Sequence, residues 1–346
     1  MHMADALLSP AVGLAMDAVA VAAIGISVAR VKKDEFSEKK IPIMGVAGAL
    51  VFAGQMINFT IPATGSSGHI GGGILLAGLL GGVPAFLSIA AVLIIQCLFF
   101  ADGGLLALGC NIFNMGVIPC LLIYPLVFKP LLKRGADVKR LSAASVVSAT
   151  AGLLAGAFCV VLETLFSGIT ELPFGTFVTL MLPVHLAIGL VEGAVTAAVL
   201  CFIWKMRPEL IESANTGKKL GAVSVKKPLI VLAALAVVVA GALSLSASSN
   251  PDGLEWAIGN VFSRGDAEAG LEEFEENAAT NPVADGAAAV QESTAFLPDY
   301  AFKDSESAAG TSVAGLVGAA VTFAVAGAAG LVIGKVKKSK KTEAGA

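Results

Sequence analysis

The chain has only three histidines, His2, His69 and His185, and the first two stand where metal chemistry is possible. The imidazole of His2, its own backbone nitrogen and the terminal amine of Met1 can reach one metal ion together through small chelate rings. Such a set of nitrogens tends towards a plane, and planar nitrogen fields are typical of Ni²⁺ or Cu²⁺. His69 is the candidate for a fourth ligand. A histidine at position 2 is a weak signal alone, so its surroundings must decide.

His69 lies in the loop GSSGHIGGG, residues 65–73, which also contains Ser66 and Ser67. Glycines without a Cβ allow one backbone to approach another segment closely. The loop can therefore fold tightly against another part of the chain, and the question becomes whether it faces the same side as Met1.

Composition indicates that the elements around these residues are membrane helices. Of the 346 residues, 56% are hydrophobic and 14% are charged, and the mean hydropathy is +0.84. Soluble domains have about 25% charged residues. The apolar residues also form long blocks, and about 20 such residues make one helical span. The predicted fold class is an all-α, polytopic membrane helix bundle.

The apolar blocks predict about nine helical segments. They fall near 8–30, 41–59, 71–100, 109–132, 140–167, 174–204, 227–247 and 311–334. Thirty residues of helix extend about 45 Å, too long for one span. The Gly81-Gly82-Val83-Pro84 sequence predicts a break inside the block 71–100, which gives a short or re-entrant helix 71–82 and a full helix 84–100.

Basic residues predict the orientation of the bundle. Lys and Arg collect in the gaps 30–40, 129–140 and 205–227 and in the tail after 334, and cytoplasmic loops are enriched in these residues. We therefore expect the amino terminus outside and the carboxyl terminus in the cytoplasm, with Met1 and the loop 60–70 on the same outer side. Residues 1–7 contain no Lys or Arg, so no signal peptide is expected and the first block should remain a span.

The segment 249–310 has two basic and thirteen acidic residues. We expect it to lie outside and, because it has few aromatic residues, to be partly disordered. Its acids can raise the local concentration of cations by long-range attraction. The alternative is a solvated spacer.

Polar residues inside the apolar blocks should face the interior of the bundle, because they are costly in lipid. Candidates to hydrogen-bond or gate the ligands lie near the outer helix ends and in the loop: Asn58, Ser66, Ser67, Gln96, Asn111 and Asn114. Hydrogen bonding between helices is the alternative role. A second set, His185, Glu192 and Thr196, shares one helical face and predicts an inner polar seam of structural character.

Four stretches resemble the substrate-binding membrane component, CbiM or NikM, of energy-coupling factor cobalt and nickel transporters. They are MHMADALLSP at the start, GQMINFTIPATGSSGHIGGG at 54–73, FFADGGLLALGCNIFNMGV at 99–117 and HLAIGLVEGAVT at 185–196. The resemblance implies that Met1, His2 and His69 bind the ion. The loop departs from the family at Ser66, where threonine is common, and at Thr60, where proline often stands, and neither change removes a ligand.

The later stretch SNPDGLE, residues 249–255, resembles the PDGLE segment of the small NikN-like accessory component. The resemblance implies a fusion of two components, and we divide the chain into four parts accordingly. They are a metal-binding transmembrane component 1–205, a cytoplasmic linker 206–226, an accessory component 227–334 with an outer segment 248–310, and a basic cytoplasmic tail 335–346. It also slightly favours nickel over cobalt.

The expected function is metal capture at the plasma membrane for an ATP-driven importer. The sequence has no GxxxxGK[ST] loop, so no enzyme activity is expected of this chain, and the resemblance implies cytoplasmic ATPase subunits and a membrane coupling subunit as partners. Co²⁺ or Ni²⁺ is the expected substrate, with no organic cofactor and no nucleic acid. The rivals are an ion-coupled secondary transporter using Asp17, Glu163 or Glu192, and an intramembrane metalloenzyme using His185 and Glu192, which lacks an HExxH motif.

Overall fold

The computed structural model describes residues 1–31, 39–278, 281–303 and 307–343. Parts of three predicted regions, the basic loop 30–40, the acidic segment and the basic tail, lie outside these residues. All nine predicted helical segments are present. They are α1 Pro10–Arg30, α2 Lys40–Gln55, α3 Gly73–Leu80, α4 Gly82–Phe100, the continuous helix Leu108–Leu131 (α5, η2 and α6), α7 Val138–Ser167, α8 Phe174–Met206, α10 Lys226–Gly241 and α14 Ala308–Glu343. The all-α helix bundle is therefore confirmed.

Six of these helices are long and apolar enough to cross a membrane. They are α1, α4, the helix Leu108–Leu131, α7, α8 and the stretch Ala309–Leu331 of α14. The helix Leu108–Leu131 contains Pro119 and Pro125, and most of it, Phe113–Phe128, is wound as a π-helix. A proline inside a helix removes one backbone hydrogen bond, and a wider turn is one way to relieve the clash of its ring with the preceding turn.

The predicted break in the block 71–100 is found at Gly81. Here α3 ends at Leu80 and α4 begins at Gly82, and Gly81 has φ +90°, a conformation that side chains with a Cβ rarely adopt. The break leaves α3 as a helix of only eight residues, buried along its whole length, directly after the loop that carries His69.

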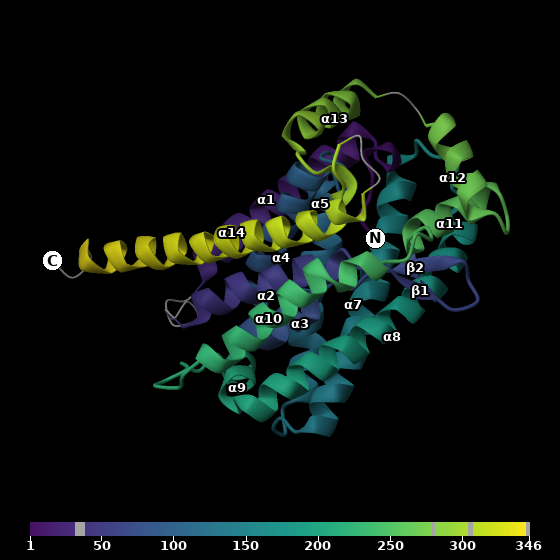
Figure 1. Ribbon diagram of the computed structural model, residues 1–346. Helices are drawn as coiled ribbons and strands as arrows, with labels where there is room; N and C mark the ends of the chain where they lie inside the picture. The colour runs from purple at the N-terminus through teal and green to yellow at the C-terminus, as the bar shows by residue number, and fades with distance from the viewer. Residues whose placement is uncertain (32–38, 279–280, 304–306, 344–346) are drawn as a thin grey trace.

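Helix α2 lies at the centre of the bundle and is buried on almost every side. Helices α10 and α14 from the carboxyl-terminal third pack along it (Figure 1). The approach to α14 is close, because a Cβ on Gly45 would lie 2.9 Å from the carbonyl oxygen of Phe323. The accessory part of the chain is thus packed into the bundle by its helices.

Two connecting segments are more ordered than the sequence predicted. The expected partial disorder of the outer segment is wrong for the described residues 253–262, 267–276 and 282–294, which form α11 Gly253–Phe262, α12 Ala267–Glu276 and α13 Pro282–Thr294. Each helix begins with an Asp or Asn cap, and Phe262 packs on Phe274 between α11 and α12. The linker 206–226 also contains a helix, α9 Pro208–Thr216. Charge content alone does not reveal such caps and contacts.

Two short strands, which the sequence did not predict, complete the elements near the amino terminus. Strand β1 Phe59–Ile61 pairs antiparallel with β2 Ser66–Gly68. This β-hairpin places His69 one residue after its second strand. The amino terminus lies beside the hairpin and α11 (Figure 1).

Helix α1 is held against α5 by a contact at Gly109, and this contact also places the residues before α1. A Cβ on Gly109 would lie 2.3 Å from the backbone nitrogen of Asp17, whose Oδ1 accepts the Gly109 N–H at 2.8 Å. We expect Gly109→Ala to push α1 away and to lower the free energy of unfolding by roughly 1–3 kcal/mol, the usual cost of overpacking. Thermal unfolding in detergent measures the effect.

The matched control is Gly25→Ala on α1, where nothing lies within 4 Å of the added methyl group. This change should leave stability unchanged or raise it by up to about 1 kcal/mol, because alanine favours the helix. Equal melting temperatures for the two variants would contradict the close contact between α1 and α5.

Candidate metal site at the amino terminus

The first residues of the chain are fixed by hydrogen bonds to the connection after α4. The side chain of Asn111 accepts a hydrogen bond from the Met3 N–H at 2.8 Å and donates one to the Met3 carbonyl at 3.3 Å. The Gly104 N–H donates to the same carbonyl at 2.9 Å. Asp5 accepts from the Ala107 N–H at 2.9 Å. The positions of Met1 and His2 are therefore set by tertiary contacts.

The terminal amine of Met1 is bound between two side chains that lie far away in the sequence. It lies 2.9 Å from Nε2 of His69 and 2.5 Å from Oδ2 of Asp252, and these two atoms lie 3.9 Å apart. Nδ1 of His69 lies 3.2 Å from the Ile70 carbonyl, which accepts only if Nδ1 carries the proton. In that tautomer Nε2 presents its lone pair to the ammonium group.

His2 lies against His69 and a second carboxylate. The two rings stack with centroids 5.1 Å apart and planes 18° apart. Nδ1 of His2 is 3.1 Å from Oδ1 of Asp102, and Oδ2 of Asp102 accepts a hydrogen bond from the Tyr300 hydroxyl at 2.5 Å. Nε2 of His2 is buried and has no hydrogen-bond partner in the described part of the chain. One imidazole nitrogen is thus oriented by a carboxylate while the other is free.

Electrostatics keep both imidazoles neutral. Burial, reinforced by the charge of the terminal ammonium, lowers the pKa of His2 and of His69 to about 3. Burial alone would raise the pKa of Asp252, but the ammonium and His69 outweigh it and hold that pKa well below its usual range. The site therefore offers neutral nitrogen donors beside an ionised carboxylate, which suits a divalent cation.

The glycine-rich loop after the β-hairpin is tied down by buried polar groups of two helices. The carboxylate of Glu192 on α8 accepts hydrogen bonds from the N–H groups of Gly71 at 3.0 Å and Gly72 at 2.9 Å. The side-chain amide of Gln55 on α2 donates to the Gly71 carbonyl at 2.9 Å. These bonds fix the backbone just after His69 and so fix the direction of its ring.

The turn formed by the PDGLE segment, residues 249–255, covers the β-hairpin and is called the PDGLE turn below. The carbonyl of Pro251 accepts the Ser67 N–H at 2.8 Å, and the carbonyl of Asn250 accepts the Ser67 hydroxyl at 2.7 Å. The indole of Trp256 donates to the Thr64 carbonyl at 2.9 Å. Asp252 caps α11 through Oδ1, which leaves Oδ2 for the Met1 amine. The accessory segment thus supplies a carboxylate to the site.

The polar residues predicted to assist the ligands have varied positions. The Ser67 hydroxyl donates a hydrogen bond to the PDGLE turn, and the hydroxyls of Ser66 and Thr64 are hydrogen-bonded to each other at 2.7 Å. The side chain of Asn111 accepts from the Met3 N–H. Asn114 donates to Glu163 at 2.7 Å. Two predicted residues remain. The backbone carbonyl of Asn58 accepts a hydrogen bond from the Ser248 N–H at 2.7 Å. The buried side-chain amide of Gln96 lies next to His2 and Tyr300. The direct hydrogen bonds to imidazoles therefore stay a prediction.

Three residues of the site were not singled out from the sequence: Asp102, Asp252 and Tyr300. Asp102 lies in the stretch FFADGG, and Asp252 is the acid of the PDGLE segment, so both carried a signal in a recognisable motif. Tyr300 carried none beyond being one of two tyrosines in the chain.

The three polar residues predicted to form an inner seam on α8 are buried. His185 and Thr196 are each 1% exposed and Glu192 is 4% exposed. Nδ1 of His185 lies 2.8 Å from the Met181 carbonyl, whereas its Nε2 has no partner. Glu192 holds the glycine-rich loop, so part of this seam is structural.

Among the residues that the structure describes, no group of three or more His, Cys, Asp or Glu side chains is arranged to hold a metal. A site made from side chains alone is therefore not preformed there. The donors that do converge are the Met1 amine and the imidazoles of His2 and His69, and the backbone nitrogen of His2 lies between them in the chain. The sequence-predicted ligands are brought together.

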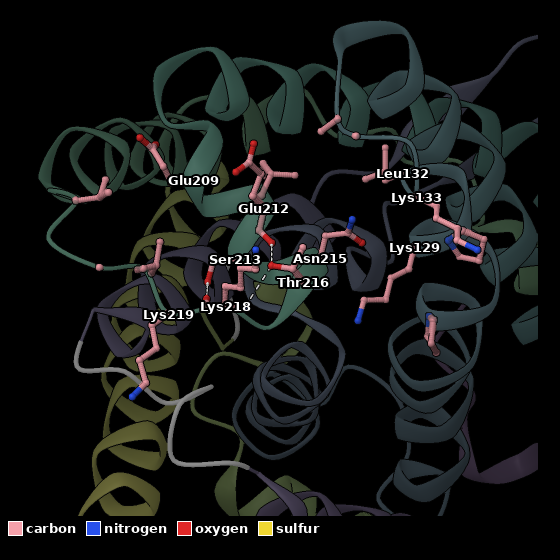
Figure 2. Close-up of a pocket in the computed structure, with 18 residues that line it drawn as sticks. Lys129, Leu132, Lys133, Glu209, Glu212, Ser213, Asn215, Thr216, Lys218 and Lys219 are labelled. Carbon is pink, nitrogen blue, oxygen red and sulfur yellow. Dashed lines mark hydrogen bonds between the residues drawn. The ribbon is translucent and has the colours of Figure 1, made fainter.

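A large cavity lies away from these ligands, between α9 and the end of the helix Leu108–Leu131. It has a volume of about 830 Å³, and Figure 2 shows Lys129, Lys133, Lys218 and Lys219 along its walls. Its lysines belong to the gaps that predict the cytoplasmic side. It contains none of the predicted metal ligands.

Replacing the Tyr300 hydroxyl tests the contacts that hold His2. We expect Tyr300→Phe to weaken binding of Ni²⁺ or Co²⁺ about 10-fold, since groups that orient metal ligands contribute roughly 10–100-fold to affinity. Without the hydroxyl, Asp102 loses a hydrogen bond that fixes its carboxylate towards His2. Competition titration of the purified chain against a chelator measures the change.

Tyr124→Phe is the matched control, because it removes the only other tyrosine hydroxyl, which donates to the Ala214 carbonyl at 2.9 Å far from the site. Its affinity should equal that of the unaltered chain. If both variants bind the metal equally well, the contacts from Tyr300 through Asp102 to His2 do not contribute to metal affinity.

Comparison with known proteins identifies the family. The model of the family described as "Cobalt uptake substrate-specific transmembrane region", CbiM, matches residues 2–210, and that of the PDGLE domain matches residues 226–335. A protein named as a fused nickel transport protein, NikMN, of Archaeoglobus fulgidus is 33% identical over 94% of this chain and 96% of its own length. The cobalt transport protein CbiM of Geobacter sulfurreducens is 28% identical over 61% of each chain.

A solved structure described as a transition metal transporter covers 60% of this chain and 93% of its own, with 29% identity and a TM-score of 0.52. The match therefore extends to the arrangement of helices over about 60% of the chain. The chain belongs to the CbiM family of cobalt and nickel transport proteins, carries a PDGLE domain, and is a multi-pass membrane protein.

Proposed function

We propose that this chain captures Ni²⁺ or Co²⁺ at the outer face of the membrane, as the substrate-binding component of an ATP-driven energy-coupling factor importer. The ligands are the Met1 amine, the backbone nitrogen and imidazole of His2, and Nε2 of His69. The observation that carries the proposal is the buried Met1 amine, 2.9 Å from His69 Nε2 and paired with Asp252.

In this arrangement the Met1 ammonium group occupies a position in which a bound ion would contact the same donor atoms of His69 and Asp252. It already contacts an imidazole nitrogen and a carboxylate, which are lone-pair donors suited to a cation. A metal ion takes its place when the amine gives up a proton and presents its own lone pair. Nε2 of His69 already faces the amine, and rotation of the His2 ring would turn Nδ1, the nitrogen that closes the small chelate ring, from Asp102 towards the ion.

Asp102 and Asp252 give the site its net charge. Each lies beside one of the ligand histidines, and Asp252 also pairs with the amine. Two partly buried carboxylates would offset the two positive charges of the ion, which lowers the cost of removing it from water. The surrounding neutral nitrogens then select among divalent ions by ligand type and geometry.

We propose nickel as the preferred substrate. The planar set of nitrogens suits Ni²⁺. The relative that matches nearly the whole chain, PDGLE domain included, is named for nickel transport. Titration of the purified chain with each ion should give a lower dissociation constant for Ni²⁺ than for Co²⁺.

Energy for transport comes in this proposal from partner subunits. The sequence contains no nucleotide-binding loop of the GxxxxGK[ST] type, so cytoplasmic ATPases and a membrane coupling subunit would supply it. In the proposed orientation the amino terminus would lie outside, and the lysine-lined cavity of Figure 2 would lie at the cytoplasmic end, where those subunits would reach the chain.

The rival ion-coupled mechanism needs carboxylates that are free to carry protons. Asp17 accepts the Gly109 N–H, Glu163 accepts from Asn114, and Glu192 accepts two loop N–H groups. Each of the three therefore has a structural partner, although Glu163 is bonded through Oε2 alone and its Oε1 is buried without a partner among the described residues. This occupation favours the importer driven by partner subunits.

The test is uptake of radioactive Ni²⁺ by cells that express the chain with and without the coupling and ATPase subunits. Uptake should require all of them and should stop when the ATPases carry a mutation that abolishes ATP hydrolysis. Uptake by the purified chain alone in vesicles, driven by a pH gradient, would contradict the proposal and support the ion-coupled mechanism.

A further inference from the structure

His185 on α8 is a buried imidazole that the capture site does not use. It is 1% exposed, and its Nδ1 lies 2.8 Å from the carbonyl of Met181, one helical turn earlier. A carbonyl oxygen can only accept, so Nδ1 carries the ring proton. The opposite nitrogen, Nε2, then carries a lone pair, and it has no hydrogen-bond partner among the residues that the structure describes.

The surroundings of that lone pair are a small cavity beside the capture site. The cavity has a volume of about 10 Å³ and is lined by His185, Met1, His69, Asp252 and Gly253, together with five other residues. A cavity of this size holds about one water molecule. A divalent ion stripped of its water is smaller, so the space fits an ion with ligands drawn from the walls.

The PDGLE turn forms the wall opposite the imidazole. A Cβ on Gly253 would lie 3.1 Å from Cε1 and 3.4 Å from Nε2 of His185, so glycine at this position keeps the free edge of the ring uncovered. The neighbouring Asp252 adds a carboxylate to the same cavity. A buried imidazole nitrogen without a proton and a partly buried carboxylate are both ligands of divalent transition metals.

A second small cavity continues from the first. It is lined by four of the same residues, Met1, Gly71, Met115 and Leu153, and it reaches Asn114 and Glu192. The polar groups therefore follow one another from the terminal amine past His185 towards Glu192, along the interior of the bundle and not on its lipid-facing surface.

We propose that Nε2 of His185 and Oδ2 of Asp252 form a second, weaker binding station for the ion, next to the capture site. The ion leaves the ligands at Met1, His2 and His69 and is held by His185 and Asp252 before it moves further inward. No bond is made or broken other than metal–ligand bonds. This inference rests on the proposed capture of Ni²⁺ or Co²⁺ and names a residue beyond its ligands.

The experiment is calorimetric titration of the purified full-length chain with NiCl₂. His2→Ala should remove tight binding and leave weak binding of one ion. In that background His185→Ala should weaken the remaining binding at least 10-fold. Thr196→Val is the matched control, because Thr196 is equally buried on the same face of α8 but does not line the cavity. It should leave the weak binding unchanged.

The outcomes of the titration distinguish a failure of the proposed capture site from a failure of the second binding station. If His2→Ala binds Ni²⁺ as tightly as the unaltered chain, the proposed capture site is wrong whatever His185 does. If His2→Ala loses tight binding but its weak binding is the same with and without His185, the second station is overturned. It is also overturned if His185→Ala alone weakens tight binding as much as His2→Ala, because His185 would then be a ligand of the capture site itself.

Discussion

One extra residue before Met1 is expected to weaken binding of Ni²⁺ or Co²⁺ about 100-fold or more, a loss of roughly 2.8 kcal/mol. The extension turns the terminal amine into an amide and so removes one of the nitrogens that complete the small chelate rings. It also has little space, because Met1 is only 5% exposed and its amine is enclosed by His69 and Asp252.

The measurement is competition titration against a chelator of known affinity, with the intact mass of the protein confirming its first residue. The control adds the same residue after Ala346, which leaves the amine free and should leave affinity unchanged. His2→Ala should give a loss of similar size by removing the imidazole that meets His69. An extended chain that binds the metal as tightly as the unaltered one would show that the amine is not a ligand.

Removal of the Glu192 carboxylate is the second change with a large expected effect. Glu192→Ala leaves the N–H groups of Gly71 and Gly72 buried without an acceptor. Each unpartnered buried group costs roughly 1–3 kcal/mol, so the free energy of unfolding should fall by about 2–5 kcal/mol. The loop carrying His69 loses its anchor, so metal affinity should fall with stability.

Two further variants sharpen this test by thermal unfolding and metal titration. Glu192→Gln keeps one acceptor oxygen but turns an amide N–H towards the loop, so its effect should be intermediate. Glu268→Ala removes an exposed carboxylate in the first turn of α12 and should change neither quantity measurably. If Glu192→Ala melts at the same temperature as the unaltered chain, the loop is held by something other than this carboxylate.

The helices were predictable because their signal is local. Blocks of about 20 apolar residues, basic residues between them and the glycines at the break in 71–100 each report on the chain within a few residues. The same holds for the chelating unit at Met1 and His2, since covalent geometry alone brings an amine, a backbone nitrogen and an imidazole within reach of one ion.

The hydrogen-bonding of the polar residues was less predictable, because it depends on which helices become neighbours. Asn111 was proposed as one of the residues that assist the histidines, and the structure shows its side chain bonded to the backbone of Met3, a contact that the sequence did not predict. The outer segment shows the same limit in another way. Its acidic composition predicted partial disorder, whereas helix caps and the packing of Phe262 on Phe274 produce helices in the described residues.

The sequence by itself determined that this protein is a helical membrane bundle with a nitrogen-rich amino terminus, because hydropathy and chelate geometry are properties of neighbouring residues. Tertiary structure alone decided that Asp252, Asp102 and Tyr300 join that site. Asp252 lies about 250 residues from Met1 and reaches the amine only because α10 and α14 pack on α2 and the PDGLE turn docks on the β-hairpin. The negative charge that Asp252 places beside the amine therefore depends on how the carboxyl-terminal helices pack on the rest of the bundle.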